Sequence, residues 1–169
     1  LIARGWRHSI FIVDDNFIGH KPKVKALLRE LIAWRARRGR GVSFLTEASL
    51  NLVDDPELLE LMVQAGFKKV FVGVETPDEA GLAECGKVQN TRRDLVAAVK
   101  QMQNAGLEVM GGFILGFDSD TSSIFERQRR FIQESGVVTA MVGLLNALPR
   151  TRLFARLKSE GRLVGETTG

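Results

Sequence analysis

Residues 63–75 read VQAGFKKVFVGVE, and this stretch decides the fold class. It places Gly66 at the expected end of an amphipathic helix and follows it with a short apolar run, Val70–Val74. Glycine readily adopts the left-handed backbone conformation that commonly ends a helix. A short apolar run bounded by turn residues is typical of a buried strand. The stretch therefore predicts a helix that turns directly into a buried strand of a parallel sheet.

The same order of helix, glycine and strand recurs along the chain. It returns at Gln103–Leu107 and at Gln133–Val137, each time before another strand-like run. The apolar runs are Ile10–Val13, Val42–Glu47, Val70–Val74, Val109–Leu115 and Ala140–Leu145. Their spacing of about 30 to 40 residues is that of successive right-handed βαβ units. The sequence predicts a curved sheet of five parallel strands in sequential order, with helices on its outer face.

Helix-start residues stand between the strand-like runs. Ser, Thr and Asp cap helix N-termini, and Pro fits the first helical turn. The candidate starts are Pro22, Asp55 with Pro56, Thr91 with Asp94, Ser122 or Ser123, and Thr151. The long connection from Thr76 to Asn90 is expected to hold one further helical turn, over Asp78–Glu84.

The composition favours one soluble globular domain. The 169 residues are 44% hydrophobic and carry a net charge of +4, and no apolar run is long enough for a transmembrane helix. Residues 1–7 lack the pattern of a signal peptide. The basic residues fall on expected helices and no Tyr is present, so nucleic-acid binding is not expected. The single cysteine, Cys85, excludes a disulfide framework and favours a reducing cytoplasm.

The acidic residues follow the strands in a pattern. They come after the first four expected strands, as Asp14, Asp15, Glu47, Glu75, Asp118 and Asp120. The carboxyl ends of the strands form the active-site mouth of α/β barrels, so these acids are expected at one rim. Asp14, Asp118 and Asp120 also fit helix caps or Asx turns. Glu47 and Glu75 directly follow residues that are expected to be buried, where a carboxylate needs a cation, a metal ion or an ammonium group.

Four motifs occur in order along the chain: Val13–Phe17, Phe71–Thr76, Gly111–Phe117 and Asn146–Thr151. In this order and spacing they resemble motifs of the radical S-adenosylmethionine (SAM) superfamily. Thr46–Ser49 and Gly111–Ile114 are similar to the subgroup that carries a cobalamin (B12)-binding domain before the radical SAM core. The resemblance covers about residues 8–163 and implies a partial TIM-like (β/α)6 barrel. Gly111–Gly116 is no P-loop, because Phe117 and Asp118 follow it instead of Lys and Ser or Thr.

The chain departs from this family in its cysteines. The family binds a [4Fe–4S] cluster through a C-x-x-x-C-x-x-C loop after its first strand, and this sequence has only Cys85. The resemblance implies that the first βα unit lies before Leu1, so that residues 1–169 are a single core fragment with strands two to six. The isolated fragment is then expected to be inactive, with no catalytic residue or metal ligand assigned in it.

The resemblance also implies roles for individual residues. Glu75, in the family's Gly-Glu motif, would accept a hydrogen bond from the methionyl ammonium of SAM, and Glu47 would face the ribose or methionine part. The fifth-strand and sixth-strand motifs would lie near adenine. The full set of expected cofactor-binding residues is Asp14, Asn16, Glu47, Gly73, Glu75, Thr76, Gly112, Ile114, Leu148 and Pro149.

By the same resemblance, the intact protein would reductively cleave SAM with the cluster to make a 5′-deoxyadenosyl radical. Cobalamin-dependent methyl transfer is a frequent outcome in this subgroup. The implied partners are a small-molecule substrate and a reductant protein such as flavodoxin or ferredoxin. An uncovered edge strand at Ile10–Val13 would also favour self-association, unless Leu1–Ser9 folds back over it.

Two other classes of protein account for the same carboxylates. One is a Mg²⁺-dependent α/β barrel lyase or aldolase with Asp14, Glu47 and Glu75 as metal ligands. The other is a non-catalytic scaffold or regulatory domain. The presence or absence of a three-cysteine loop upstream of Leu1 would discriminate between these classes and the radical SAM enzyme.

Overall fold

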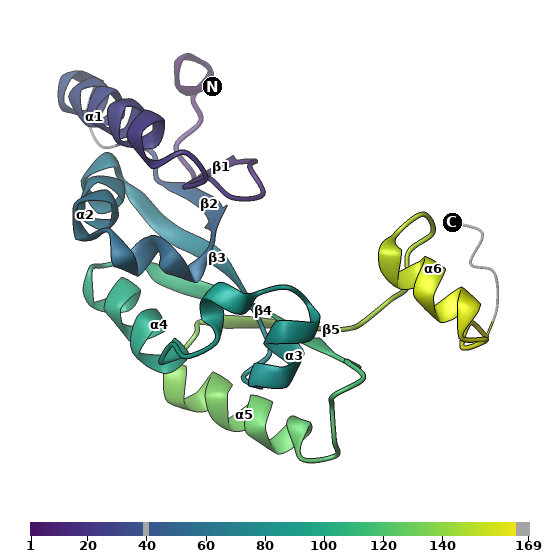
Figure 1. Cartoon of the computed structure of the whole chain (residues 1–169). Helices are drawn as coiled ribbons and strands as arrows, with labels where there is room; N and C mark the ends of the chain where they lie inside the picture. Colours follow the sequence, from purple (N-terminus) through teal and green to yellow (C-terminus); the bar gives the residue numbers. More distant parts are fainter. Residues whose placement is uncertain (39–40, 165–169) are drawn as a thin grey trace.

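A computed structural model describes residues 1–38 and 41–164. Its centre is one sheet of five parallel strands in the order β1-β2-β3-β4-β5. The strands are β1 (Ile10–Ile12), β2 (Phe44–Ala48), β3 (Phe67–Glu75), β4 (Glu108–Leu115) and β5 (Thr139–Leu144). Strands that are consecutive in sequence are neighbours in the sheet (Figure 1), which confirms the predicted order.

Helices alternate with the strands. They are α1 (Lys21–Arg38), α2 (Pro56–Ala65), α3 (Glu79–Glu84), α4 (Leu95–Asn104), α5 (Ile124–Ser135) and α6 (Arg152–Ser159). Short 3₁₀ helices, which the sequence patterns did not predict, cover Ile2–Arg4, Leu50–Asp54 and Val88–Asn90. Helices α1, α2, α4 and α5 lie along one face of the sheet, whereas α6 stands apart beyond the end of β5 (Figure 1). The fold is the expected partial α/β barrel with its helices outside.

Most of the expected helix boundaries are confirmed by hydrogen bonds at the caps. The Asp55 carboxylate accepts from the Leu58 N–H at 3.1 Å and the Asp78 carboxylate from the Gly81 N–H at 3.1 Å. Gly66 ends α2 with a φ of 97°. The expectation for α4 is partly wrong, because Asp94 caps this helix and the Thr91 hydroxyl instead donates to the Val88 carbonyl. Thr91 instead follows a 3₁₀ turn over Val88–Asn90 as its C-cap.

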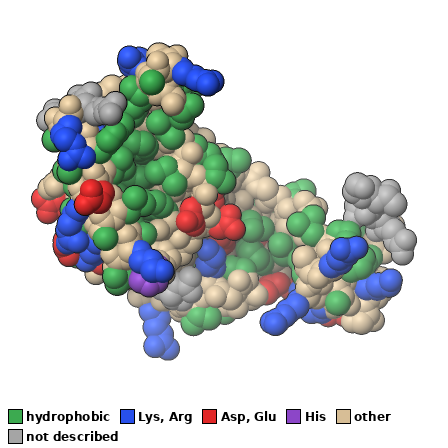
Figure 2. All heavy atoms as spheres, turned by 90° about the horizontal axis from the view of Figure 1, so that it is seen from above, with side chains coloured by type: hydrophobic (Ala, Val, Ile, Leu, Met, Phe, Trp, Pro, Cys, Tyr) green, Lys and Arg blue, Asp and Glu red, His purple; other side chains and the backbone are tan. Residues whose placement is uncertain are grey.

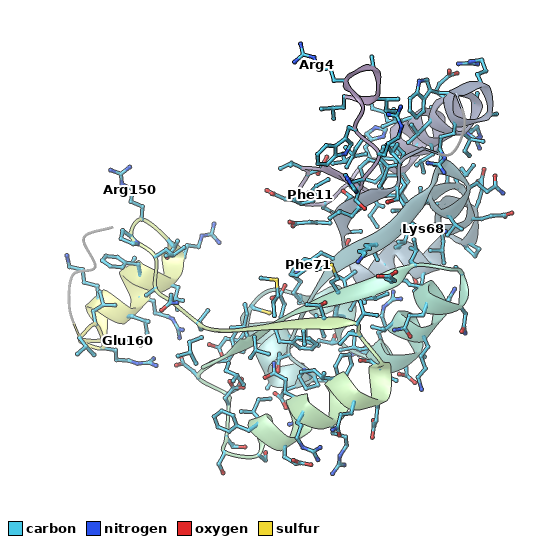
Figure 3. All side chains as sticks on the ribbon, turned by 180° about the vertical axis from the view of Figure 1, so that it is seen from behind. Arg4, Phe11, Lys68, Phe71, Arg150 and Glu160 are labelled. Atoms are coloured by element: carbon cyan, nitrogen blue, oxygen red, sulfur yellow. The ribbon has the colours of Figure 1, made fainter. Side chains whose placement is uncertain are left out.

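The two faces of the sheet differ in burial. In β3, Val70, Val72 and Val74 are fully buried beneath the helices. Phe71, between them, is half-buried on the opposite face. Figure 3 shows Phe71 and Phe11 on this same open face of the sheet. The hydrophobic core therefore lies between sheet and helices, and the open face is left for other groups.

The two edge strands are largely exposed. In β1, Phe11 is 44% exposed, and Ile2 from the N-terminal 3₁₀ helix packs against the core beside it. The fifth strand forms where it was expected but is largely exposed, since Val142 is 51% and Leu144 73% exposed. No described helix covers the outer side of β5, because the chain after it runs out to α6 (Figure 1). Within the described ranges, no helix is long and apolar enough to cross a membrane.

Candidate functional site

A pocket lies at the carboxyl ends of the first three strands. It has a volume of about 280 Å³, and the loop after β1, the ends of β2 and β3 and the segment after α3 line it. The polar lining residues and the glycine beside them are Asp15, Asn16, Glu47, Ser49, Gly73, Glu75 and Lys87. In the space-filling view, acidic side chains gather in the middle of the molecule, bordered by hydrophobic ones (Figure 2). The sheet thus brings the predicted Glu47 and Glu75 to one pocket.

Glu75 has an unusual backbone. Its φ is 67°, in the left-handed region, and the pairing of β3 with β4 shifts register between Gly73 and Glu75. A β-bulge of this kind redirects a side chain. A non-glycine residue in the left-handed region costs about 1–2 kcal/mol, and such strain is held in place where the surrounding structure imposes it. The backbone is therefore strained at Glu75, the residue that the sequence predicts to bind the ammonium group of the ligand.

Gly73 leaves room for the Glu75 carboxylate. A Cβ atom at Gly73 would lie 2.5 Å from Oε1 of Glu75 and 3.4 Å from Nζ of Lys87. Real Cβ atoms do not approach another atom so closely, so a side chain at this position would displace the carboxylate. The Gly-x-Glu spacing is thus explained by packing inside the pocket.

Lys87 is the functional candidate that the sequence reasoning missed. Its Nζ lies 3.2 Å from Oε1 of Glu75, and the two side chains are 33% and 17% exposed. The Lys87 N–H donates to the Leu82 carbonyl at 2.8 Å, which fixes this residue just after α3. Only the position of Lys87 in an unusually long connection marked it in the sequence. Glu75 therefore pairs with an ammonium group, which is one of the partners expected from its position after buried residues.

Asn16 joins the loops after β1 and β2. Its Oδ1 accepts from the Ser49 N–H at 3.3 Å and from the Ser49 hydroxyl at 3.2 Å. Asp14 does not line the pocket, and its Oδ1 accepts from the Asn16 N–H at 3.0 Å in an Asx turn. Of the two predicted residues in this loop, Asn16 reaches the pocket and Asp14 shapes the loop behind it.

The other predicted residues lie outside this pocket. Thr76 is fully buried and its Oγ1 accepts from the Asp78 N–H at 3.2 Å. Gly112 is on the open face of β4, where a Cβ atom would lie 2.8 Å from the ring of Phe71. Ile114 is half-buried two residues further along β4. Leu148 is 63% exposed, and Pro149 follows it in the segment that leads to α6.

The acids after β4 do not join the pocket. Asp120 accepts from the Gly116 and Phe117 N–H groups, as expected of a turn residue. Asp118 forms ion pairs with Arg156 and Arg162. The hydrogen bonds from Arg162 and then from Arg156 lower the pKa of Asp118 to about 2. The acidic rim was predicted over four strands and extends over three. Asp118 forms ion pairs with Arg156 of α6 and with Arg162 instead.

A metal centre is not favoured by this arrangement. Among residues 1–38 and 41–164, no three His, Cys, Asp or Glu side chains are grouped so that they could hold a metal ion. The Mg²⁺ site expected from Asp14, Glu47 and Glu75 is therefore not formed, because Asp14 is engaged in its turn and Glu75 pairs with an ammonium group. The geometry suits a ligand that carries its own positive charge.

Comparison with known proteins agrees with the sheet and the pocket. The chain is 47% identical to an uncharacterized methyltransferase of Synechocystis sp. over 169 residues, which are 100% of the chain and 32% of the relative. It is 42% identical to the hopanoid C-2 methylase of Rhodopseudomonas palustris over 164 residues, 97% of the chain and 31% of that relative. The chain thus spans about a third of the length of these relatives.

A solved structure has the same fold. The radical SAM methyltransferase TsrM from Kitasatospora setae, with cobalamin and a [4Fe–4S] cluster bound, superposes with a TM-score of 0.79 at 19% identity. The superposition covers 94% of this chain and 31% of that chain. A sequence model of the family described as "Radical SAM superfamily" matches residues 1–132. Over more than half of its length, the chain carries the sequence of this family, and it belongs to the radical SAM superfamily.

Proposed function

We propose that the pocket binds the methionyl end of SAM and that the whole protein is a radical SAM methyltransferase. One observation carries the proposal: a largely buried carboxylate, Glu75, lies over Gly73 and pairs with an ammonium group at 3.2 Å. The α-ammonium of SAM is a cation of the same kind. The names of the relatives, among them a hopanoid C-2 methylase and bacteriochlorophyllide methyltransferases, support methyl transfer.

Glu75 and Lys87 together suit a zwitterion. The α-ammonium of the ligand would take the hydrogen bond to Glu75, and the Lys87 ammonium would then lie beside the α-carboxylate. Charge-assisted hydrogen bonds of both kinds are stronger than neutral ones. Glu47 would accept from a ribose hydroxyl at the end of β2, and Asn16 would keep the neighbouring loops in place through Ser49. Gly112, Ile114, Leu148 and Pro149 remain the residues proposed for the adenine side.

A [4Fe–4S] cluster belongs to the proposal but does not fit the residues of this chain alone. Bound SAM supplies the methyl group and the chemistry of its reductive cleavage, for which a [4Fe–4S] cluster is needed. Cys85 is the only cysteine in 169 residues and is outside the lining of the pocket, so this chain cannot supply the three cysteine ligands. We therefore place the cluster-binding unit outside residues 1–169.

The remaining parts of the proposal concern the whole protein. Residues 8–163 would form its core, in a reducing cytoplasm, with a flavodoxin or ferredoxin as electron donor. Cobalamin would be a second cofactor, as in the structure of TsrM. The isolated chain, without the three cysteines, would not cleave SAM.

The substitution Glu75→Gln tests the cofactor assignment. In the protein expressed from its whole gene, with its cluster reconstituted, SAM affinity should fall about 10- to 100-fold, because a charge-assisted hydrogen bond contributes about 1.5–3 kcal/mol. Isothermal titration calorimetry with SAM measures this directly, without turnover. Glu47→Gln should weaken binding less, since a hydroxyl donor carries no charge.

Glu134→Gln is the matched control. Glu134 is exposed on α5, far along the chain from the pocket, and its substitution should leave SAM affinity unchanged. If Glu75→Gln binds SAM as tightly as the unaltered protein while its cluster is intact, Glu75 has been assigned wrongly. If the sequence upstream of Leu1 in the gene lacks a three-cysteine loop, the proposed reaction fails as a whole.

A further inference from the structure

A second pocket lies between the sheet and α6. Its volume is about 430 Å³, and it is lined by the C-terminal end of α3, the segments that follow β4 and β5, and α6. Figure 2 shows hydrophobic side chains on the surface between the body of the molecule and the part that carries α6. Sites for small molecules are concave and have volumes of about 300–1,000 Å³. We call this cavity the α6 pocket.

The walls of the α6 pocket are mainly apolar. Phe117 is 5% exposed and packs against Gly81 of α3, while Leu145 and Leu153 are half-buried on opposite sides. Cys85 also lines this cavity, and its thiol donates to the Leu82 carbonyl at 3.4 Å. Burial raises the pKa of Cys85, so the thiol is protonated and uncharged at neutral pH. These groups favour a ligand without charge.

The charged groups of the α6 pocket are mostly bound to protein partners. Glu84 accepts from the N–H groups of Asp118 and Ser119 at 3.1 and 3.2 Å. Arg156 donates to Asp118 at 2.7 Å and lies 3.7 Å from Glu84. Glu84, Asp118 and Arg156 thus neutralise each other at the rim. Arg152, the third charged residue of the lining, is exposed to solvent and forms no ion pair within the described part of the chain.

The α6 pocket adjoins the proposed SAM pocket. Glu84 and Cys85 line the former, and Lys87, two residues further along, lines the latter. Gly86, with a φ of 78°, makes the turn between them. The segment 84–87 thus connects the linings of the two pockets, and a molecule in the α6 pocket would lie near the cofactor.

The cavity is shaped for a small molecule and not for a protein surface. No residue of α6 is buried, and its apolar Leu153 and Leu157 are only half covered by the described protein. Helices α3 and α6 and the segments after β4 and β5 border the space, which is partly open to solvent, whereas the exposed Val142 and Leu144 of β5 form a separate surface. An apolar ligand between these elements would complete the contacts that α6 lacks.

From this geometry we propose that the α6 pocket binds an uncharged, apolar small molecule. In the context of the proposed function, on which this part of the assignment rests, that molecule is the acceptor of the methyl group. The probe for the first experiment is Nile red, a neutral apolar dye whose fluorescence rises on leaving water.

Titration of the full-length protein with Nile red, without SAM, should give saturable binding. Leu153→Glu places a charge in the apolar wall and should weaken this binding at least about tenfold, a change of about 1.4 kcal/mol. Since α6 buries no residue, the substitution should leave the fold intact, as circular dichroism can verify. Leu27→Glu, at a position 52% exposed on α1, is the control and should retain the affinity.

Alkylation of Cys85 gives a second measurement. N-Ethylmaleimide modification, followed by mass spectrometry of the peptide that contains Cys85, should slow at least about fivefold when Nile red saturates the pocket. Three results would each overturn the proposal for the α6 pocket. They are a dye affinity in Leu153→Glu equal to that of the unaltered protein, a loss of dye affinity in Leu27→Glu as large as in Leu153→Glu, and alkylation of Cys85 that the dye does not slow. If the dye results hold but Glu75→Gln leaves SAM affinity unchanged, the apolar pocket stands and the cofactor assignment fails.

Discussion

Glu75 combines a strained backbone with a side chain that the protein holds in one place. Its left-handed φ of 67° and the adjacent bulge turn the carboxylate over Gly73, where Lys87 meets it. Neither a regular strand nor a larger residue at position 73 would allow this. The strain is local, and the fully buried Val72 and Val74 on the other face of β3 keep the strand anchored against the helices.

Gly73→Ala should weaken SAM binding while the chain stays folded. The new methyl group would lie 2.5 Å from Oε1 of Glu75, so the carboxylate must move away from the ligand. We expect a loss of about tenfold or more, because a misdirected charge-assisted hydrogen bond forfeits about 1.5–3 kcal/mol. Calorimetry with SAM measures the affinity, and thermal unfolding checks the fold.

Gly143→Ala provides the comparison for Gly73→Ala. Gly143 is also a strand glycine, in β5, and a Cβ atom there would meet nothing within 4 Å. Its substitution should leave SAM affinity unchanged and stabilise the fold slightly, since alanine loses less backbone entropy on folding. Equal losses of affinity in the two variants would mean that Gly73 acts only through the strand and not through Glu75.

At the scale of elements, α6 is capped at its N-terminus and held to the segment after β4 by ion pairs. The Thr151 hydroxyl oxygen accepts from the Phe154 N–H at 3.1 Å and caps the helix, as predicted. Asp118 joins the other side through Arg156 and Arg162. Exposed ion pairs contribute little individually and weaken with salt. The helix is therefore the element most easily released from the sheet.

Acid should release α6 before the rest of the molecule unfolds. The pKa of Asp118 is lowered to about 2 from 3.8, so its ionised form favours the docked helix above pH 3.8, and this contribution is lost as the pH falls through about 2. Hydrogen exchange of the α6 backbone amides should accelerate over this window. In Asp118→Asn, exchange should already be fast at pH 5. An unchanged exchange rate in this variant would show that other contacts hold α6.

Across the whole molecule, the sheet ends in two exposed edges. Phe11 is 44% and Val13 82% exposed at or beside β1, and Val142 is 51% exposed in β5. Ile2 of the N-terminal segment packs against the core, yet Phe11 and Val13 stay exposed. Unprotected edge strands pair with other chains unless charges or other segments prevent it. The open edge of β1 thus supports the proposal that the 169-residue chain associates with itself.

Self-association of the chain should depend on this edge. Sedimentation velocity of residues 1–169 should show species larger than the monomer, and Val13→Lys should shift the population towards monomer by placing a charge at the edge. Leu144→Lys, at the opposite edge, should have a smaller effect. A single monomeric species for the unaltered chain at tens of micromolar would contradict the prediction.

The sequence by itself determined the parallel strand order, the helix caps at Asp55 and Thr151, and the presence of Glu47 and Glu75 at the ends of their strands. These features depend on neighbouring residues and on short periodicities, which a sequence displays directly. Only the tertiary structure decided that Lys87 meets Glu75, that Asp118 binds α6, and that β5 stays exposed. Each of these features depends on how separate elements pack against one another in space. A local sequence pattern does not show such contacts, because the fold sets the distance between residues that lie far apart in the chain.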